Sequence, residues 1–110
     1  IHLDEVFEHF VCAEDVRNIK PDPECYLKAI DYLGLPAEAI FAVEDTLSGV
    51  EAAVRAGLVC IGIREENSVP DAEEIKARTA LYFDDYAAFL AWSAFAAQSL
   101  PDWCGSCWRL

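Results

Sequence analysis

The 110-residue sequence predicts an α/β fold built around a parallel sheet. Two observations support this prediction. Strand-like and helix-like segments alternate along the chain four times, which is the order of elements in α/β proteins. In addition, the segments at 39–43 and 58–63 are apolar without alternation, as expected for strands that are buried on both faces. Strands of this kind normally have helices packed on either side of the sheet.

The first strand and the first helix are expected in the N-terminal third. Residues 9–13 (HFVCA) form a short apolar run that is typical of a strand, and a polar, turn-like segment follows. Asp22 can serve as the N-cap of a helix that has Pro23 in its first position, where the missing N–H of proline costs nothing. Gly34 predicts the end of this helix.

A second helix is expected between the two apolar strands. Ser48 and Glu51 have the spacing of a capping box, which marks the N-terminus of a helix. The helix would cover residues 49–56 and end at Gly57.

The last predicted elements are shorter or less regular. A polar loop at 64–70 leads to a short helix, for which Asp71 and Glu74 have capping-box spacing. A short strand at 80–83 precedes a helix over 84–97 that is rich in alanine and aromatic residues. With these elements, a predicted strand is followed by a predicted helix four times along the chain.

The chain is expected to form one domain. We assign residues 1–90 to its core and 91–110 to an irregular tail, and we leave open whether that tail is native. The C-x-x-C sequence at Cys104 and Cys107 resembles a thioredoxin motif, but too few residues follow for the helix that such redox chemistry needs.

Composition excludes several classes of function. Twenty acidic residues against eight basic ones give a net charge of −12, which argues against nucleic acid and anionic membranes as partners. No apolar run approaches the roughly 20 residues of a membrane span, and the acidic N-terminal segment does not look like a signal peptide. Cys12, Cys25 and Cys60 lie in apolar or amphipathic runs rather than in a disulfide framework, so we expect a cytoplasmic location.

Two adjacent acids, Glu44 and Asp45, follow the apolar strand at 39–43. In open α/β sheets, ligands bind beyond the carboxyl ends of the strands. Two carboxylates at that place, with water and phosphate oxygens, would suit a magnesium ion. Alternatively, Asp45 only caps the next helix, and spacing alone does not decide between these interpretations.

Lys20 precedes a rigid Pro-Asp-Pro turn at the start of the first predicted helix. A lysine held by a stiff turn is a suitable point charge for a phosphate group. The alternative is an ordinary surface lysine beside a helix N-terminus, which this pattern alone favours.

These motifs occur together in a recognisable order. Residues 20–63 read KPDPECYLKAIDYLGLPAEAIFAVEDTLSGVEAAVRAGLVCIGI. The stretch resembles the C-terminal half of a haloacid-dehalogenase superfamily hydrolase, in the branch of the β-phosphoglucomutase-like and phosphoglycolate-phosphatase-like proteins. The resemblance implies a Rossmann-like three-layer sandwich with a parallel sheet.

The resemblance also implies roles for the candidate residues. Lys20 would be a catalytic residue that binds the substrate phosphoryl group and steadies the nucleophile. Asp45 would be a ligand of Mg²⁺, and Glu44 would be its partner in the same metal site. The cofactor that the resemblance implies is Mg²⁺, and the implied substrate is a phosphorylated small molecule. A lysine and two acids suit phosphoryl transfer, because this reaction depends mainly on positioning and charge neutralisation.

The sequence departs from the family pattern in its N-terminal part. The family nucleophile lies in an Asp-x-Asp-Gly motif, and the one Asp-Asp pair here, Asp84-Asp85, does not match it. The second-motif Ser/Thr and the substrate-selecting cap are also missing. We therefore expect an incomplete core that lacks the nucleophile strand and the cap, and a chain that is inactive alone.

Two other classes remain open. An exposed sheet edge favours a non-catalytic interaction module, for example a homodimer that pairs through this edge. A receiver-like signalling domain is the other alternative, with Asp45 as the phospho-acceptor.

Overall fold

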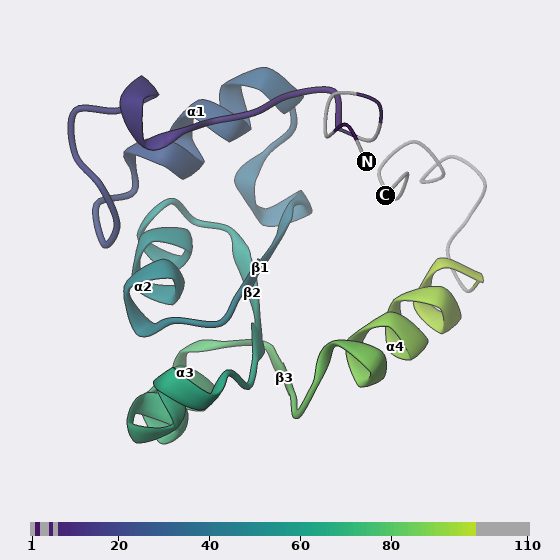
Figure 1. The fold of residues 1–110 in the computed structure, drawn as a ribbon. Helices are drawn as coiled ribbons and strands as arrows, with labels where there is room; N and C mark the ends of the chain where they lie inside the picture. The colour runs from purple at the N-terminus through teal and green to yellow at the C-terminus, as the bar shows by residue number, and fades with distance from the viewer. Residues whose placement is uncertain (1, 3–4, 6, 99–110) are drawn as a thin grey trace.

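The computed structural model describes residues 2, 5 and 7–98 (Figure 1). From the first helix onward, helices and strands alternate as the sequence predicts. In chain order the elements are the 3-10 turn η2 (Ala13–Asp15), α1 (Glu24–Leu33), the 3-10 turn η3 (Ala37–Ala39), β1 (Phe41–Glu44), α2 (Leu47–Arg55), β2 (Val59–Ile63), the 3-10 helix η4 (Glu66–Asp71), α3 (Ala72–Arg78), β3 (Leu81–Phe83) and α4 (Tyr86–Gln98).

The three strands form a parallel sheet in the order β1-β2-β3. Phe41 pairs with Val59, and Ile61 pairs with Leu81. The predicted α/β class with a parallel sheet is therefore confirmed. The central strand, β2, is buried from Cys60 to Ile63.

Helices cover both faces of the sheet, which gives the predicted three layers. On one face, side chains of β1 and β2 pack against α2 and α3, and α1 adds partly buried residues to this cluster. On the other face, Ile61 and Ile63 pack against Phe89 and Trp92 of α4. Figure 1 shows α2 and α3 on one side of the strands and α4 on the other.

Strand β1 is buried on one face rather than on both, so this part of the prediction was wrong. Ala42 and Glu44 are buried, whereas Phe41 and Val43 are 43% and 38% exposed. Helix α4 packs on this side of the sheet, where its buried residue Phe89 contacts Ile61 and Ile63 of β2. The Trp92 ring reaches Phe41 edge-on, with 6.4 Å between the ring centroids. An apolar run without alternating polar residues is therefore not sufficient evidence that both faces of a strand are buried.

The predicted strand at 9–13 does not form. This segment has no strand pairing, and Ala13 already begins the turn η2, where the Cys12 N–H donates to the Asp15 carboxylate. Within the part of the chain that the structure describes, β1 pairs with β2 alone. A strand needs a neighbouring strand to satisfy its backbone N–H and C=O groups, and none of the described strands lies beside residues 9–13.

The first helix has the predicted end and a slightly later start. Asp22 Oδ1 accepts a hydrogen bond from the Glu24 N–H at 3.0 Å, so the aspartate does satisfy an amide of the first turn. Pro23 precedes the helix instead of occupying its first position. Gly34 ends it with φ 65°, a left-handed conformation that glycine adopts without strain.

The cap of α2 is Thr46 and not Ser48. The Thr46 hydroxyl accepts a hydrogen bond from the Gly49 N–H at 3.1 Å, and the helix begins at Leu47. The predicted partner of Ser48, Glu51, instead binds Arg55 and Arg78. Thr46 lies two residues earlier in extended conformation, so its hydroxyl caps the amide of Gly49 and the helix starts before Ser48.

The predicted capping box of α3 is also absent. Asp71 lies at the N-terminus of α3, but its side chain makes no capping hydrogen bond. The helix η4 leads directly into α3, and the Val69 carbonyl accepts the Ala72 N–H. Glu74 binds Arg78 at 2.8 Å instead.

The helix predicted over 84–97 forms as α4, and it extends into the segment that we also assigned to an irregular tail. Residues 91–98 are helical, because alanine favours helix and aromatic side chains of α4 pack on the sheet. The rest of the predicted tail, residues 99–110, lies outside the described residues. No helix in the described ranges is both long and apolar enough to cross a membrane.

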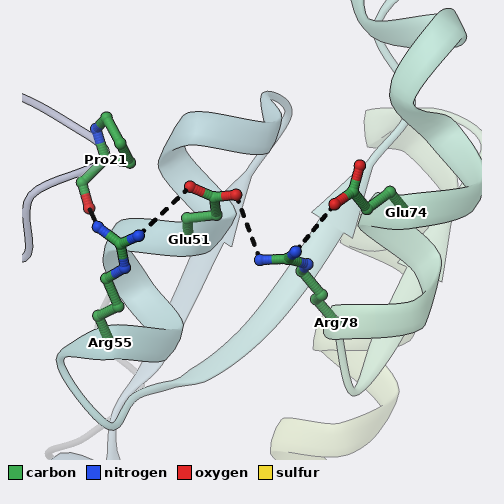
Figure 2. Close-up of polar contacts among 5 residues, drawn as sticks. All are labelled: Pro21, Glu51, Arg55, Glu74 and Arg78. Atoms are coloured by element: carbon green, nitrogen blue, oxygen red, sulfur yellow. Dashed lines mark hydrogen bonds and ion pairs between the residues drawn. The ribbon is translucent and has the colours of Figure 1, made fainter.

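A chain of polar contacts connects the loop before α1 to α2 and α3 (Figure 2). Arg55 donates to the Pro21 carbonyl at 3.3 Å and lies 3.9 Å from Glu51. Glu51 also accepts from Arg78 at 3.2 Å, and Arg78 reaches Glu74. This network ties the loop that carries the Lys20-Pro21 bond, which is cis, to the helices.

Candidate functional site

Glu44 is the centre of a small polar cluster at the C-terminal end of β1. Its side chain lies on the face of the sheet that α1 and α2 cover, and the residue is only 8% exposed. The Lys20 ammonium and the Tyr26 hydroxyl both donate to Glu44 Oε1. Two residues that lie far apart in the sequence, Lys20 and Glu44, are therefore brought into direct contact.

Gly49 makes room for the Glu44 carboxylate. A Cβ atom at Gly49 would overlap with Glu44 Oε2 and would lie 2.8 Å from Oε1. Gly49 belongs to the first turn of α2, so the carboxylate lies at a helix N-terminus, where the helix dipole favours negative charge. Glycine at this position lets the acid approach the helix closely.

Asp45 follows Glu44 and leaves the strand. It is partly buried and makes no hydrogen bond or ion pair with any residue that the structure describes. It is not the cap of α2, because Thr46 has that role. The capping alternative for Asp45 is therefore wrong, and its assignment as a metal ligand stays a prediction.

Lys20 is held from two directions. Its side chain is 41% exposed, yet its ammonium contacts Glu44 and lies 5.1 Å from the centroid of the Tyr26 ring, a cation–π distance. The following residue, Pro21, is fixed by Arg55. These contacts place a positive charge at the end of β1 where it keeps access to solvent.

Tyr26 is the member of the cluster that sequence reasoning did not assign to the site. It lies in the first predicted helix, two residues after the first residue of α1. Burial raises the pKa of the Tyr26 hydroxyl, and the hydrogen bond to Glu44 raises it further. A tyrosine on a core-facing helical position usually brings its hydroxyl to a polar partner, and this was the signal available in the sequence.

Cys60 lies in the buried part of β2 near the same cluster. Burial raises the pKa of its thiol to about 11, the negative charge of Glu44 acts in the same direction, and Lys20 opposes them. Cys60 therefore behaves as a small buried side chain rather than as a nucleophile.

The space beside Lys20 is an open pocket of about 250 Å³. Its lining is mostly aliphatic, with Lys20 as the charged residue. The residues that line it are Val11, Cys12, Ala13, Val16, Ile19, Lys20 and Cys25.

The acids at the end of β1 fit a magnesium ion of the kind that binds mainly through water and substrate. No group of three His, Cys, Asp or Glu side chains converges in the described ranges, so a cage of protein ligands is not present there. Mg²⁺ often uses one or two carboxylates together with water and phosphate oxygens. Among the residues that the structure describes, Asp45 makes no hydrogen bond or ion pair and Glu44 Oε2 accepts no hydrogen bond, so these oxygens are open to such a role.

Comparison with known proteins gives a consistent result. The family model described as haloacid dehalogenase-like hydrolase matches residues 1–63. The protein YhcW of Bacillus subtilis is 38% identical over 86 residues, which cover 78% of this chain and 34% of that protein. The phosphorylated carbohydrates phosphatase of Thermotoga maritima is 41% identical over 58 residues, which cover 53% of this chain and 27% of that protein.

A solved structure is also similar. The structure of CbbY from Rhodobacter sphaeroides in complex with phosphate matches with a TM-score of 0.70 and 33% sequence identity. The match covers 76% of this chain and 36% of that chain. The present chain thus spans about a third of the length of the relatives that it resembles.

Proposed function

The chain belongs to the haloacid dehalogenase-like hydrolases, and from this membership we propose that it carries the lysine and the acidic pair of a magnesium-dependent phosphomonoester hydrolase. The observation that supports the proposal most directly is the contact between Lys20 and Glu44, next to the unengaged carboxylate of Asp45. A positive charge and two acids at the carboxyl end of a parallel strand suit a phosphate group bound through a cation.

Each residue would have a distinct task in phosphoryl transfer. Lys20 would bind the phosphoryl oxygens and oppose the negative charge that develops on them. Asp45 would be a ligand of Mg²⁺, directly or through water, and Glu44 would be its partner in the same metal site. The bound ion would neutralise phosphate charge and orient the phosphoryl group.

The proposed substrate is a phosphorylated small molecule. Among the relatives, one is named for phosphorylated carbohydrates, and the CbbY structure holds phosphate. A complete relative would form an aspartyl-phosphate and either hydrolyse it or transfer it, as in a phosphosugar mutase. The present sequence contains no Asp-x-Asp-Gly motif, so we propose that the 110-residue chain alone gives no turnover.

Magnesium titration of the 110-residue chain tests the site. Asp45→Asn is expected to weaken Mg²⁺ binding measured by calorimetry, because the amide removes the negative charge from the proposed ligand. Asp31→Asn makes the same change at an exposed acid of α1 and should leave binding unchanged. Equal affinities of wild type and Asp45→Asn would contradict the assignment.

A separate assay tests the absence of turnover. Purified chain should release no more phosphate from phosphomonoesters than a boiled control. Activity that persists through repeated purification and is lost in Lys20→Gln would show that the chain is a complete catalyst.

An interaction module is the second candidate function. Within the described residues β1 lies at an edge of the sheet, and Val43 of this strand is 38% exposed. Such an edge supports pairing with another copy of the chain. A molecular mass that doubles with concentration in size-exclusion chromatography would favour this role, and a constant monomer mass would argue against it.

Two further points belong to the proposal. The receiver-like alternative requires a stable aspartyl-phosphate on Asp45 after treatment with acetyl phosphate, which mass spectrometry detects.

A cytoplasmic location is supported by the free thiols of Cys12, Cys25 and Cys60.

A further inference from the structure

We propose that Tyr26 is a positioning residue of the magnesium site, whose hydroxyl holds the Glu44 carboxylate in the orientation that the ion needs. This inference rests on the proposed function. It concerns a residue of α1 that neither the sequence motifs nor the comparisons single out.

Packing fixes the Tyr26 ring before any ion binds. The ring lies partly buried against the cluster of core residues that α2, α3 and the sheet share. Its hydroxyl donates to Glu44 Oε1, and its face lies under the Lys20 ammonium. One side chain therefore contacts both charged members of the site.

The Glu44 carboxylate is confined on two sides. Gly49 lies against Oε2 so closely that no side chain fits between them, while Tyr26 and Lys20 hold Oε1. A carboxylate that is bounded in this way has little freedom to rotate, and Oε2 is the oxygen that remains without a hydrogen bond.

Tyr26 and Lys20 differ in what they can do when substrate arrives. Lys20 has a long, partly exposed side chain, and it must turn toward the phosphoryl group in order to bind it. Tyr26 is neutral and fixed by packing, so its hydrogen bond can persist when Lys20 leaves Glu44. The hydroxyl would then be the donor that keeps the carboxylate in place during phosphate binding.

The expected effect can be stated from the behaviour of other metal sites. Ligating carboxylates are themselves hydrogen-bonded, and removal of such a partner typically weakens metal binding by about 10- to 100-fold. Tyr26→Phe removes only the hydroxyl and keeps the ring in the core and under Lys20. We therefore expect Mg²⁺ binding about 10-fold weaker than in the wild type.

The experiment is a calorimetric Mg²⁺ titration of the 110-residue chain and two variants. Tyr32→Phe makes the same chemical change on the same helix, where the ring stacks on His9 with centroids 5.0 Å apart. It is expected to bind Mg²⁺ as the wild type does. Circular dichroism checks that all three proteins have the same helix content.

A spectroscopic measurement gives a second readout that does not require Tyr26→Phe to fold. Addition of Mg²⁺ should change the ultraviolet absorption of tyrosine in the wild type, because the carboxylate that Tyr26 contacts gains a cation. The change should be lost in Asp45→Asn and kept in Tyr32→Phe. A wild-type difference spectrum without a tyrosine signal, at Mg²⁺ concentrations that saturate the chain, would overturn the role of Tyr26.

The outcomes separate this inference from the proposed function. A wild-type chain that binds no Mg²⁺ overturns both. Normal binding by Tyr26→Phe, together with weakened binding by Asp45→Asn, overturns the role of Tyr26 and leaves the magnesium site in place.

Discussion

Replacing Gly49 by alanine is expected to destabilise the protein, although the same change in an ordinary helix would stabilise it. Gly49 lies in the first turn of α2, and the added methyl group would occupy the position of the Glu44 carboxylate. That carboxylate ends a flexible side chain, but Lys20 and Tyr26 hold it and the residue is 8% exposed. It can move away only by giving up these contacts.

The magnitude follows from opposing contributions. Alanine is favoured over glycine by up to about 1 kcal/mol in a helix. Loss of the hydrogen bond from Tyr26 to the charged carboxylate costs about 1.5–3 kcal/mol. The partly exposed pair of Lys20 and Glu44 adds about 1 kcal/mol or less, because solvent screens it. The net loss in the free energy of unfolding is therefore expected to be about 1–3 kcal/mol.

Urea denaturation followed by circular dichroism measures this loss. In a Glu44→Ala background the obstructing carboxylate is gone, so Gly49→Ala should then stabilise the protein by up to about 1 kcal/mol. This reversal of sign is specific to the proposed contact. If Gly49→Ala stabilises the otherwise unchanged chain, the description of the Glu44 site is refuted.

Three other measurements test the structure. Thr46→Ala should cost about 1 kcal/mol of stability in urea denaturation while Ser48→Ala costs little, because the Thr46 hydroxyl caps α2; a larger loss for Ser48→Ala would contradict this. A thiol reagent near neutral pH should modify Cys60 much more slowly than the exposed Cys12, because burial raises the pKa of the Cys60 thiol to about 11. Mass spectrometry measures both rates, and equal rates would be inconsistent with a buried Cys60. The backbone N–H groups of Arg17 and Asn18 lower the pKa of Glu24 below its ordinary value of 4.5. The contribution of the Glu24 carboxylate to stability is therefore present above pH 4.5 and lost as the pH falls through the lowered pKa. Glu24→Gln should make the free energy of unfolding depend less on pH in this acidic range, and an unchanged dependence would exclude this contribution.

The features that sequence predicted well depend on local pattern. The apolar runs that became β1, β2 and β3 were recognised because hydrophobic residues cluster over strand-length segments between turn signals. Gly34 ended α1 as expected, since a left-handed residue there favours glycine. The proximity of Lys20 and Glu44 was implied only by the family resemblance, and the fold now provides its geometric basis.

The features that sequence missed depend on contacts between distant residues. Whether residues 9–13 form a strand is decided by a neighbouring strand, and local hydrophobicity carries no information about that neighbour. Thr46 and Ser48 are both acceptable caps, and backbone geometry chose the first. The approach of Tyr26 to Glu44 depends on how α1 packs against the sheet, which no local motif specifies.

The order of the sheet has a consequence for the kinetics of folding. Each strand pairs with the next strand along the chain, so every β-ladder closes over a single intervening helical connection. Pairing between strands that are close in sequence has a lower entropic cost of loop closure than pairing between distant strands, although parallel ladders still form more slowly than local helical contacts. During synthesis β1 can therefore pair with β2 as soon as α2 has formed. We expect β3 to join this nucleus next, and α4 to add the second helical layer last.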